Sequence, residues 1–252
     1  MTHNIEFCMK VNEKQWIESL RNGTVCFNPA DRFIKQAEED GNNEQGDKYE
    51  GVFARIKEND VRLLELRKRF GEDLEEIYEN EHVLLRRKSS RKVPIFCTYG
   101  IRRDELKIRE GSVKEVDGEY VGTVDYTFPG KIYKEFLDNP DAWGFYASSG
   151  HFYSALEEAL DRGHFSYVKT VISYDVDLTT EFYFEPDSEY SELSHKRKDL
   201  DYQHEIRYRI LNLPMDEKYL LKYKPLSDHS CGFAGGELRL EMHCKCALLE
   251  ES

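Results

Sequence analysis

The sequence predicts an α+β fold with a mixed, mostly antiparallel sheet, flanking helices and a helical insertion. Short runs rich in Val, Ile, Phe and Tyr recur along the chain, and segments with helical spacing of apolar residues separate them. No internal repeat and no clean linker divides the 252 residues. We therefore expect a single α+β domain over residues 1–252, with a polar loop and helical insertion at about 35–92.

The first residues predict a strand, a helix and a second strand. Residues 5–11 are suited to a strand, and Asn12 with Gln15 has the spacing of a reciprocal helix cap. Gly23 is expected to end the helix in a left-handed conformation. The apolar run 24–27 then gives the second strand.

The insertion begins with a polar, acidic loop at 38–47, which we expect to lie on the surface. Apolar residues with helical spacing follow between 60 and 80, and Gly71 is expected to divide them into two helices. These apolar residues are Leu63, Leu64, Leu66, Phe70, Leu74 and Ile77.

The second half of the chain predicts further strands. The run 93–99 is apolar and suits a buried central strand that starts near Pro94. A hairpin is expected around Asp117-Gly118, because this dipeptide tolerates positive φ. The remaining expected elements are helices at 131–138 and 152–162, two strands within 164–184, and strands at 200–211, 220–223 and 238–248.

The composition limits the possible partners. The net charge of -13 disfavours non-specific binding to nucleic acid, which requires clustered cations. Basic runs at 86–92 and 196–198 are interpreted as solvated faces. No apolar stretch approaches the roughly 18 residues of a membrane-spanning helix, and the first residues lack a signal-peptide pattern. The six cysteines form no regular framework, so we expect reduced thiols in a cytoplasmic protein.

The strand predicted at 200–211 carries the densest set of functional groups in the chain. Strand alternation would place Gln203, Glu205, Arg207 and Arg209 on one face. A carboxylate at 205 can stabilise a developing oxocarbenium ion, while a carboxamide at 203 orients the acceptor, which is the chemistry that cleaves a nicotinamide–ribose bond. A second interpretation is a half-exposed strand in which Glu205 pairs with Arg207 or Arg209.

Two other groups of residues suggest metal sites on weaker patterns. Asp47-x-x-Glu50 offers two carboxylates for a divalent cation, or a cap for the segment that follows. The spacing of Cys244-Lys245-Cys246 does not match zinc knuckles, although His229, Cys231 and His243 are near in sequence. Buried strand thiols are the preferred interpretation, and we expect no metal.

Four blocks of the sequence together resemble a family of bacterial and phage proteins of unknown function. The late strand 202–210 matches a pattern of Gln or an acidic residue, then Glu, and later Arg. The other blocks are Arg21-Asn22-Gly23-Thr24-Val25-Cys26-Phe27-Asn28, Gly46-Asp47-Lys48-Tyr49-Glu50-Gly51 and Ile95-Phe96-Cys97-Thr98-Tyr99. They occur in the family's order and span most of the chain.

The layout is more distantly similar to ADP-ribosyltransferases, which bind NAD. That resemblance implies Glu205 and Gln203 as catalytic residues, with Tyr99 stacking on nicotinamide. It implies Lys10, Thr98 and Arg207 as cofactor-binding residues, with Lys10 standing where the family has a first-strand Arg or His.

Two hypotheses for function follow from these patterns. The first is an ADP-ribosyltransferase-like or NAD-cleaving protein that uses Glu205. The alternative is a non-catalytic protein that acts in bacterium–phage conflict, in defence or anti-defence, and binds a protein partner through its acidic surface. The charge of -13 and the acidic loop support the alternative.

Overall fold

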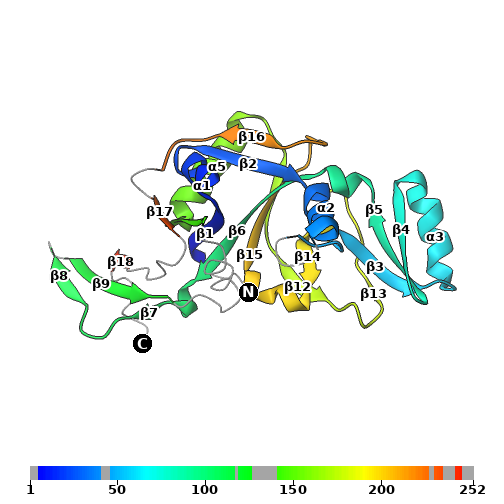
Figure 1. Cartoon of the computed structure of the whole chain (residues 1–252), viewed down its shortest axis with the longest axis horizontal. Helices are drawn as coiled ribbons and strands as arrows, with labels where there is room; N and C mark the ends of the chain where they lie inside the picture. Colours follow the sequence, from blue (N-terminus) through cyan, green and yellow to red (C-terminus); the bar gives the residue numbers. More distant parts are fainter. Residues whose placement is uncertain are drawn as a thin grey trace. The chain divides into compact units, whose positions relative to one another are not determined.

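The computed structural model describes residues 5–40, 46–116, 119–126, 141–226, 230–234 and 242–245 (Figure 1). Its strand pairs are mostly antiparallel and its helices are few, so the predicted α+β class is confirmed. Within the single domain that the sequence predicts, the structure distinguishes two compact units. The first comprises Met1–Asn22, Tyr99–Tyr153 and Leu226–Ser252, and the second comprises Gly23–Thr98 and Ser154–Pro225.

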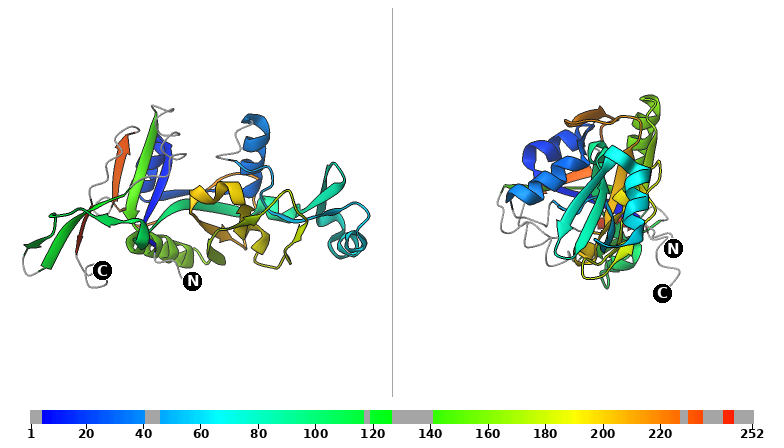
Figure 2. Two further views of the ribbon diagram at one scale, coloured as in Figure 1. Left: turned by 90° about the horizontal axis from the view of Figure 1, so that it is seen from below. Right: turned by 90° about the vertical axis from the view of Figure 1, so that its right-hand side faces the viewer.

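The first unit contains two small sheets. In one, β1 (Ile5–Glu13) pairs antiparallel with β10 (Ala142–Ser148) and with residues 99–102 of β6 (Pro94–Arg102). Strand β17 (Ser230–Ala234) extends this sheet beyond β10 (Figure 2). In the other sheet, β9 pairs antiparallel with three short strands; its members are β7 (Lys107–Ile108), β8 (Lys114–Val116), β9 (Glu119–Asp125) and β18 (Met242–Lys245).

The expected opening strand and helix are present, but the predicted cap is wrong. Strand β1 continues to Glu13, so α1 (Lys14–Arg21) starts after it and Glu13 is the N-cap residue. The Asn12 side chain accepts a hydrogen bond from the Glu13 backbone N–H instead (2.8 Å). Gly23 has a φ of 83°, which confirms the left-handed position predicted there.

The predicted hairpin near residue 117 is confirmed by the pairing of Val116 with Glu119 at the ends of β8 and β9. The residues of its turn and the helix predicted at 131–138 lie outside the described residues. Of the last predicted strand at 238–248, residues 242–245 are described and form β18.

The second unit is built around strands β15 and β6. Strand β15 lies between β11 and β6, and β2 pairs antiparallel with both β6 and β16. Strands β12 and β14 form a separate parallel pair. The bounds are β2 (Thr24–Pro29), α2 (Ala30–Asp40), α5 (Ser149–Arg162, which begins in the first unit), β11 (Tyr167–Val171), β12 (Ser173–Val176), β14 (His195–Arg197), β15 (Glu205–Ile210) and β16 (Tyr219–Lys222).

The insertion contains one helix and a sheet, so the prediction of two helices is wrong. Helix α3 (Val61–Phe70) ends where Gly71 adopts a φ of 52°, and the chain continues as a strand. The sheet order is β13 (Phe182–Tyr183), β3 (Val52–Lys57), β5 (His82–Arg87) and β4 (Leu74–Glu79). Leu63 and Leu66 pack against this sheet, whereas Leu64 is 61% exposed. Pairing with β5 therefore outweighs the helical spacing of the β4 residues.

The predicted strand at 200–211 begins later than the alternation suggests. Residues Lys198–Gln203 form a short 3₁₀ helix, and His204 turns the chain with a φ of 39°. Strand β15 starts only at Glu205, and all its residues are buried. Gln203 therefore does not share a strand face with Glu205, and that part of the prediction is wrong. Among the described residues, no helix has the length and apolar character needed to cross a membrane.

Replacing Gly23 with Ala is expected to lower the urea midpoint of unfolding. A Cβ at this position would lie 2.4 Å from the Tyr223 carbonyl oxygen, in addition to the positive φ. Strain of this kind costs about 1–3 kcal/mol. Gly71→Ala is the matched control, because its φ is also positive but no atom lies within 4 Å of the added Cβ. Equal losses for the two variants would contradict the role of the Tyr223 contact.

Candidate functional site

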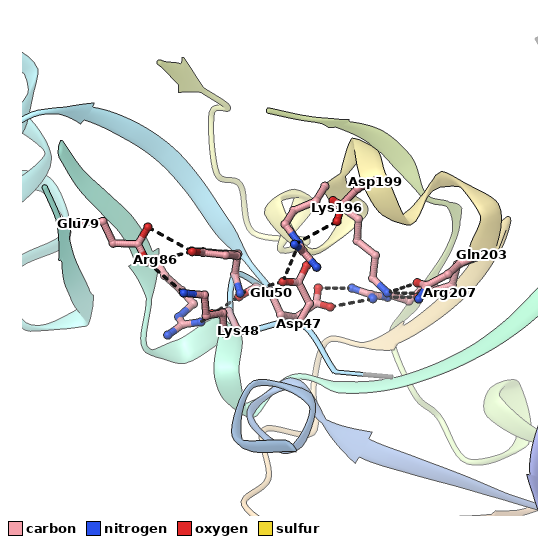
Figure 3. A network of polar contacts seen from close by, with 12 residues as sticks. Asp47, Lys48, Glu50, Glu79, Arg86, Lys196, Asp199, Gln203 and Arg207 are labelled. Atoms are coloured by element: carbon pink, nitrogen blue, oxygen red, sulfur yellow. Dashed lines mark hydrogen bonds and ion pairs between the residues drawn. The ribbon is translucent and has the colours of Figure 1, made fainter. Parts of the chain in front are cut away.

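Arg207 is the centre of a buried network of charged side chains in the second unit (Figure 3). Its guanidinium donates to both oxygens of Glu50, with Nη1–Oε1 at 2.5 Å and Nη2–Oε2 at 3.0 Å. Its Nε donates to Glu205 Oε1 at 2.7 Å, and Nη1 also donates to the Leu193 carbonyl at 2.7 Å. Arg207 is 1% exposed, so these bonds replace water around the whole cation.

Glu205 is held from both sides. Lys196 donates from Nζ to Glu205 Oε2 at 2.6 Å, while Arg207 occupies the other oxygen. The same Lys196 nitrogen donates to Gln203 Oε1 at 3.0 Å, and it thereby joins the carboxylate and the carboxamide. The Cys97 thiol adds a hydrogen bond to Glu205, and the Glu205 backbone N–H donates to the Tyr174 hydroxyl at 2.9 Å.

The loop 46–51 delivers the second carboxylate, Glu50. The loop packs closely at Gly46, where a Cβ would lie 2.4 Å from the Phe33 carbonyl oxygen. Asp47 Oδ1 accepts from the Tyr49 backbone N–H at 3.0 Å, so the capping interpretation of Asp47 is confirmed. Asp47 and Glu50 are 3% and 2% exposed, which makes the expected surface position wrong for Asp47.

A further arginine fixes the backbone of this loop. Arg86 is 2% exposed and donates from Nη1 to the carbonyl oxygens of Lys48 (3.1 Å) and Glu50 (3.2 Å). Its Nε donates to Glu75 Oε2 at 2.8 Å. The Glu50 side chain therefore points to Arg207 while its carbonyl is bound by Arg86, which leaves the residue little freedom.

Alternation of charge keeps the network ionised. Burial raises the pKa of Glu205, but Arg207 and Lys196 outweigh burial and hold this pKa well below its usual range. Burial lowers the pKa of Lys196, and Glu205 reverses that effect, so the Lys196 pKa lies above its usual value. Asp47 differs, because burial and the neighbouring Glu50 raise its pKa even though Arg197 lies 3.4 Å away.

The structure brings together three of the residues that the sequence singled out. Gln203, Glu205 and Arg207 share the contacts of Lys196 and of the Glu205 carboxylate, although Gln203 comes from the 3₁₀ helix. The second interpretation of this strand, in which Glu205 pairs with Arg207, is confirmed at 2.7 Å. Thr98 is also buried in the second unit, at 3% exposure.

The two other predicted NAD contacts belong to the first unit. Met9 on β1 pairs with Tyr99 on β6, so the next residue, Lys10, projects from the opposite face of the sheet. Lys10 and Tyr99 therefore do not line one site. The Tyr99 hydroxyl lies 2.7 Å from the Tyr126 hydroxyl, and burial raises the pKa of both phenols, to about 12 for Tyr126.

Sequence reasoning missed Lys196, Glu50 and Cys97 as members of the network. The sequence predicts a solvated face for the basic run 196–198, which is wrong for Lys196 at 8% exposure and for the half-buried Arg197. The residues next to the run are mostly polar, so they do not indicate that Lys196 is buried beside Glu205, nine positions further along the chain. The signal available in the sequence was the acidic pair Asp47 and Glu50. In the structure these carboxylates lie beside the late cations Arg197 and Arg207.

Metal ligands do not gather among the residues that the structure describes. Cys231 is exposed, and the proposed ligands His229 and Cys246 lie outside the described residues. In comparisons with known proteins, no family model, curated protein or solved structure matches this chain. The resemblances noted from the sequence therefore stay predictions.

Replacing Glu205 with Gln is expected to destabilise the fold by about 3–5 kcal/mol, because the change leaves Lys196 and Arg207 as buried cations without one carboxylate. Chemical denaturation followed by circular dichroism measures the loss. Glu185→Gln is the matched control, because it breaks an exposed ion pair: the side chain of Arg69 is 51% exposed and that of Glu185 is 57% exposed. This variant should leave the midpoint of denaturation nearly unchanged. Similar midpoints for both variants would remove the structural role of Glu205.

The stability difference between the wild type and the Glu205→Gln variant should decrease as the pH falls. Because the folded pKa of Glu205 is below that of an unfolded Glu, its stabilisation is present above about pH 4.3 and is lost as the pH falls further. Melting temperatures from pH 7 to pH 3 should therefore bring the wild type and the Glu205→Gln variant closer together at low pH. A difference that widens on acidification would contradict this assignment.

Proposed function

We propose that this is a non-catalytic cytoplasmic protein that binds a basic protein partner in bacterium–phage conflict. The observation that carries the proposal is the engagement of Glu205. Both of its carboxylate oxygens are bonded to buried cations, and the residue is 6% exposed. A carboxylate in this position supports the fold, and it would have to exchange Lys196 or Arg207 before it could face a ribosyl cation.

The charge of the chain supplies the physical basis for partner binding. A net charge of -13 attracts a basic surface over distances comparable with the Debye length, about 10 Å at 0.1 M salt. Such attraction raises the association rate and disfavours acidic partners. The same charge argues against nucleic acid as the partner.

A second candidate is an NAD-cleaving or ADP-ribosyltransferase-like protein. It is favoured by one observation: Lys196 holds the Gln203 carboxamide and the ionised Glu205 carboxylate on a single nitrogen. This activity requires the network to open, so that Glu205 exchanges Lys196 or Arg207 for substrate.

Partner binding is expected to depend on salt. A tagged protein immobilised in 50 mM salt should retain a basic partner from host or phage extract, and the partner should be released between 50 and 500 mM salt because screening shortens the attraction. Mass spectrometry identifies the retained protein, and its affinity is then measured with purified material. Failure to retain any basic protein at low salt would contradict the proposal.

NAD distinguishes the two candidates. A ligand that binds only the folded state raises the melting temperature, so the proposed function predicts no shift with 1 mM NAD and no release of nicotinamide. The second candidate predicts a shift in the wild type and turnover that Glu205→Gln abolishes. The Glu185→Gln protein serves as the control, since this residue lies outside the network.

A further inference from the structure

A groove with a volume of about 610 Å³ lies in the second unit, outside the buried network. One wall is a face of α2, where Arg32, Lys35, Gln36 and Glu39 recur at helical spacing. The other wall is the segment 216–218, and Asn28 and Pro29 complete the lining. The volume falls within the range of ligand-binding pockets, about 300–1,000 Å³.

The two walls are held in place by pairing that precedes and follows them. Strand β2 leads directly into α2, and β16 follows the segment 216–218. The two strands pair from Phe27 with Tyr219 to Thr24 with Lys222. The backbone N–H of Met215 also donates to the Lys92 carbonyl at 2.9 Å. The groove is therefore a built feature of this unit.

Two of the carboxylates in the groove are already neutralised. Asp31 accepts from Arg91 Nε at 2.6 Å and pairs with Lys35 at 2.7 Å. Burial raises the Asp31 pKa, but these two cations outweigh it and hold the pKa below its usual value. Asp216 pairs with Lys92 at 3.0 Å. Both carboxylates therefore already have an internal ion-pair partner, although the Asp216 side chain is 77% exposed.

Three charged groups remain available to a partner. Arg32, Glu39 and Glu217 are exposed and form no hydrogen bond or ion pair with the residues that the structure describes, although Asp31 and, more weakly, Glu39 raise the pKa of Lys35. Arg32 lies in the first turn of α2, where the helix dipole favours an anion, and Glu39 lies in the last turn, where it favours a cation. The two positions are separated by about 10 Å along the helix axis. Arg32 and Glu39 therefore present opposite charges near the two ends of this face of α2, and the β2–β16 register places Glu217 beside the start of the helix.

We propose that this groove binds an extended segment of the basic partner, with an acidic side chain at Arg32 and basic side chains at Glu39 and Glu217. The inference rests on the proposed function and names the surface through which it acts. An extended segment rises about 3.3 Å per residue, so an acidic and a basic residue three positions apart match the groove. The lining contains no aromatic side chain to stack on a nucleobase or a nicotinamide ring, which favours a peptide.

The test uses the capped peptide Asp-Gly-Ser-Lys-Gly-Lys and the full-length protein labelled with ¹⁵N. Titration should shift amide resonances of residues 28–39 and 216–218 in the wild type. Glu39→Lys combined with Glu217→Lys should weaken Kd by about three-fold or more, as expected for the loss of two exposed ion pairs. Glu58→Lys with Glu81→Lys is the matched control, since it makes the same charge change at two exposed carboxylates outside the groove.

The outcomes separate this inference from the proposed function. Equal weakening by both double variants, or shifts that spread over other surfaces, would overturn the groove as the binding site. If the retained partner still binds both double variants equally, the proposed function stands and the groove assignment fails. If the wild type retains no basic partner, the proposed function fails, while peptide shifts confined to the groove still show its ligand preference.

Discussion

The ion pair between Glu50 and Arg207 is the contact on which the second unit depends. It joins residues 157 positions apart and lies at 1% side-chain exposure on both sides. Neither charge is stable in the interior alone, because removing an ion from water costs several kcal/mol. The loop 46–51, strand β14 and strand β15 therefore have to assemble together, because they supply Glu50, Lys196 and the pair Glu205 and Arg207 to one buried network.

The same constraint explains why the late strand looks catalytic in sequence. A row of Gln, Glu and Arg suits an exposed site that handles a charged substrate, and it suits equally a buried network with alternating signs. Lys196 decides between these arrangements, since its ammonium group occupies the Glu205 oxygen that a substrate would need. A perturbed pKa marks functional sites and structural ion pairs alike, and here the ion pairs are satisfied within the chain.

The charged side chains that a ligand can reach therefore lie on the surface and not in the buried network. Glu50, Glu205, Lys196 and Arg207 are paired with one another in the buried network, while Arg32, Glu39 and Glu217 in the groove beside α2 are exposed. The two features lie in the same unit, and the loop 46–51 that supplies Glu50 packs closely against α2 at Phe33 and Ala37.

The sequence by itself determined the α+β class, the opening strand and helix, the left-handed turn at Gly23 and the hairpin of β8 and β9, because local spacing and backbone preference fix these elements. It also singled out Gln203, Glu205 and Arg207. Only the tertiary structure decided that 74–79 is a strand, and that Lys196 and Glu50 are buried as the partners of Glu205 and Arg207. The Glu50–Arg207 ion pair spans 157 positions, so no local pattern in the sequence encodes it. Strand β4 pairs with the next strand, β5, and Lys196 pairs with Glu205 nine residues later. In these two cases the helical spacing and the basic run are local patterns that favour the wrong structure.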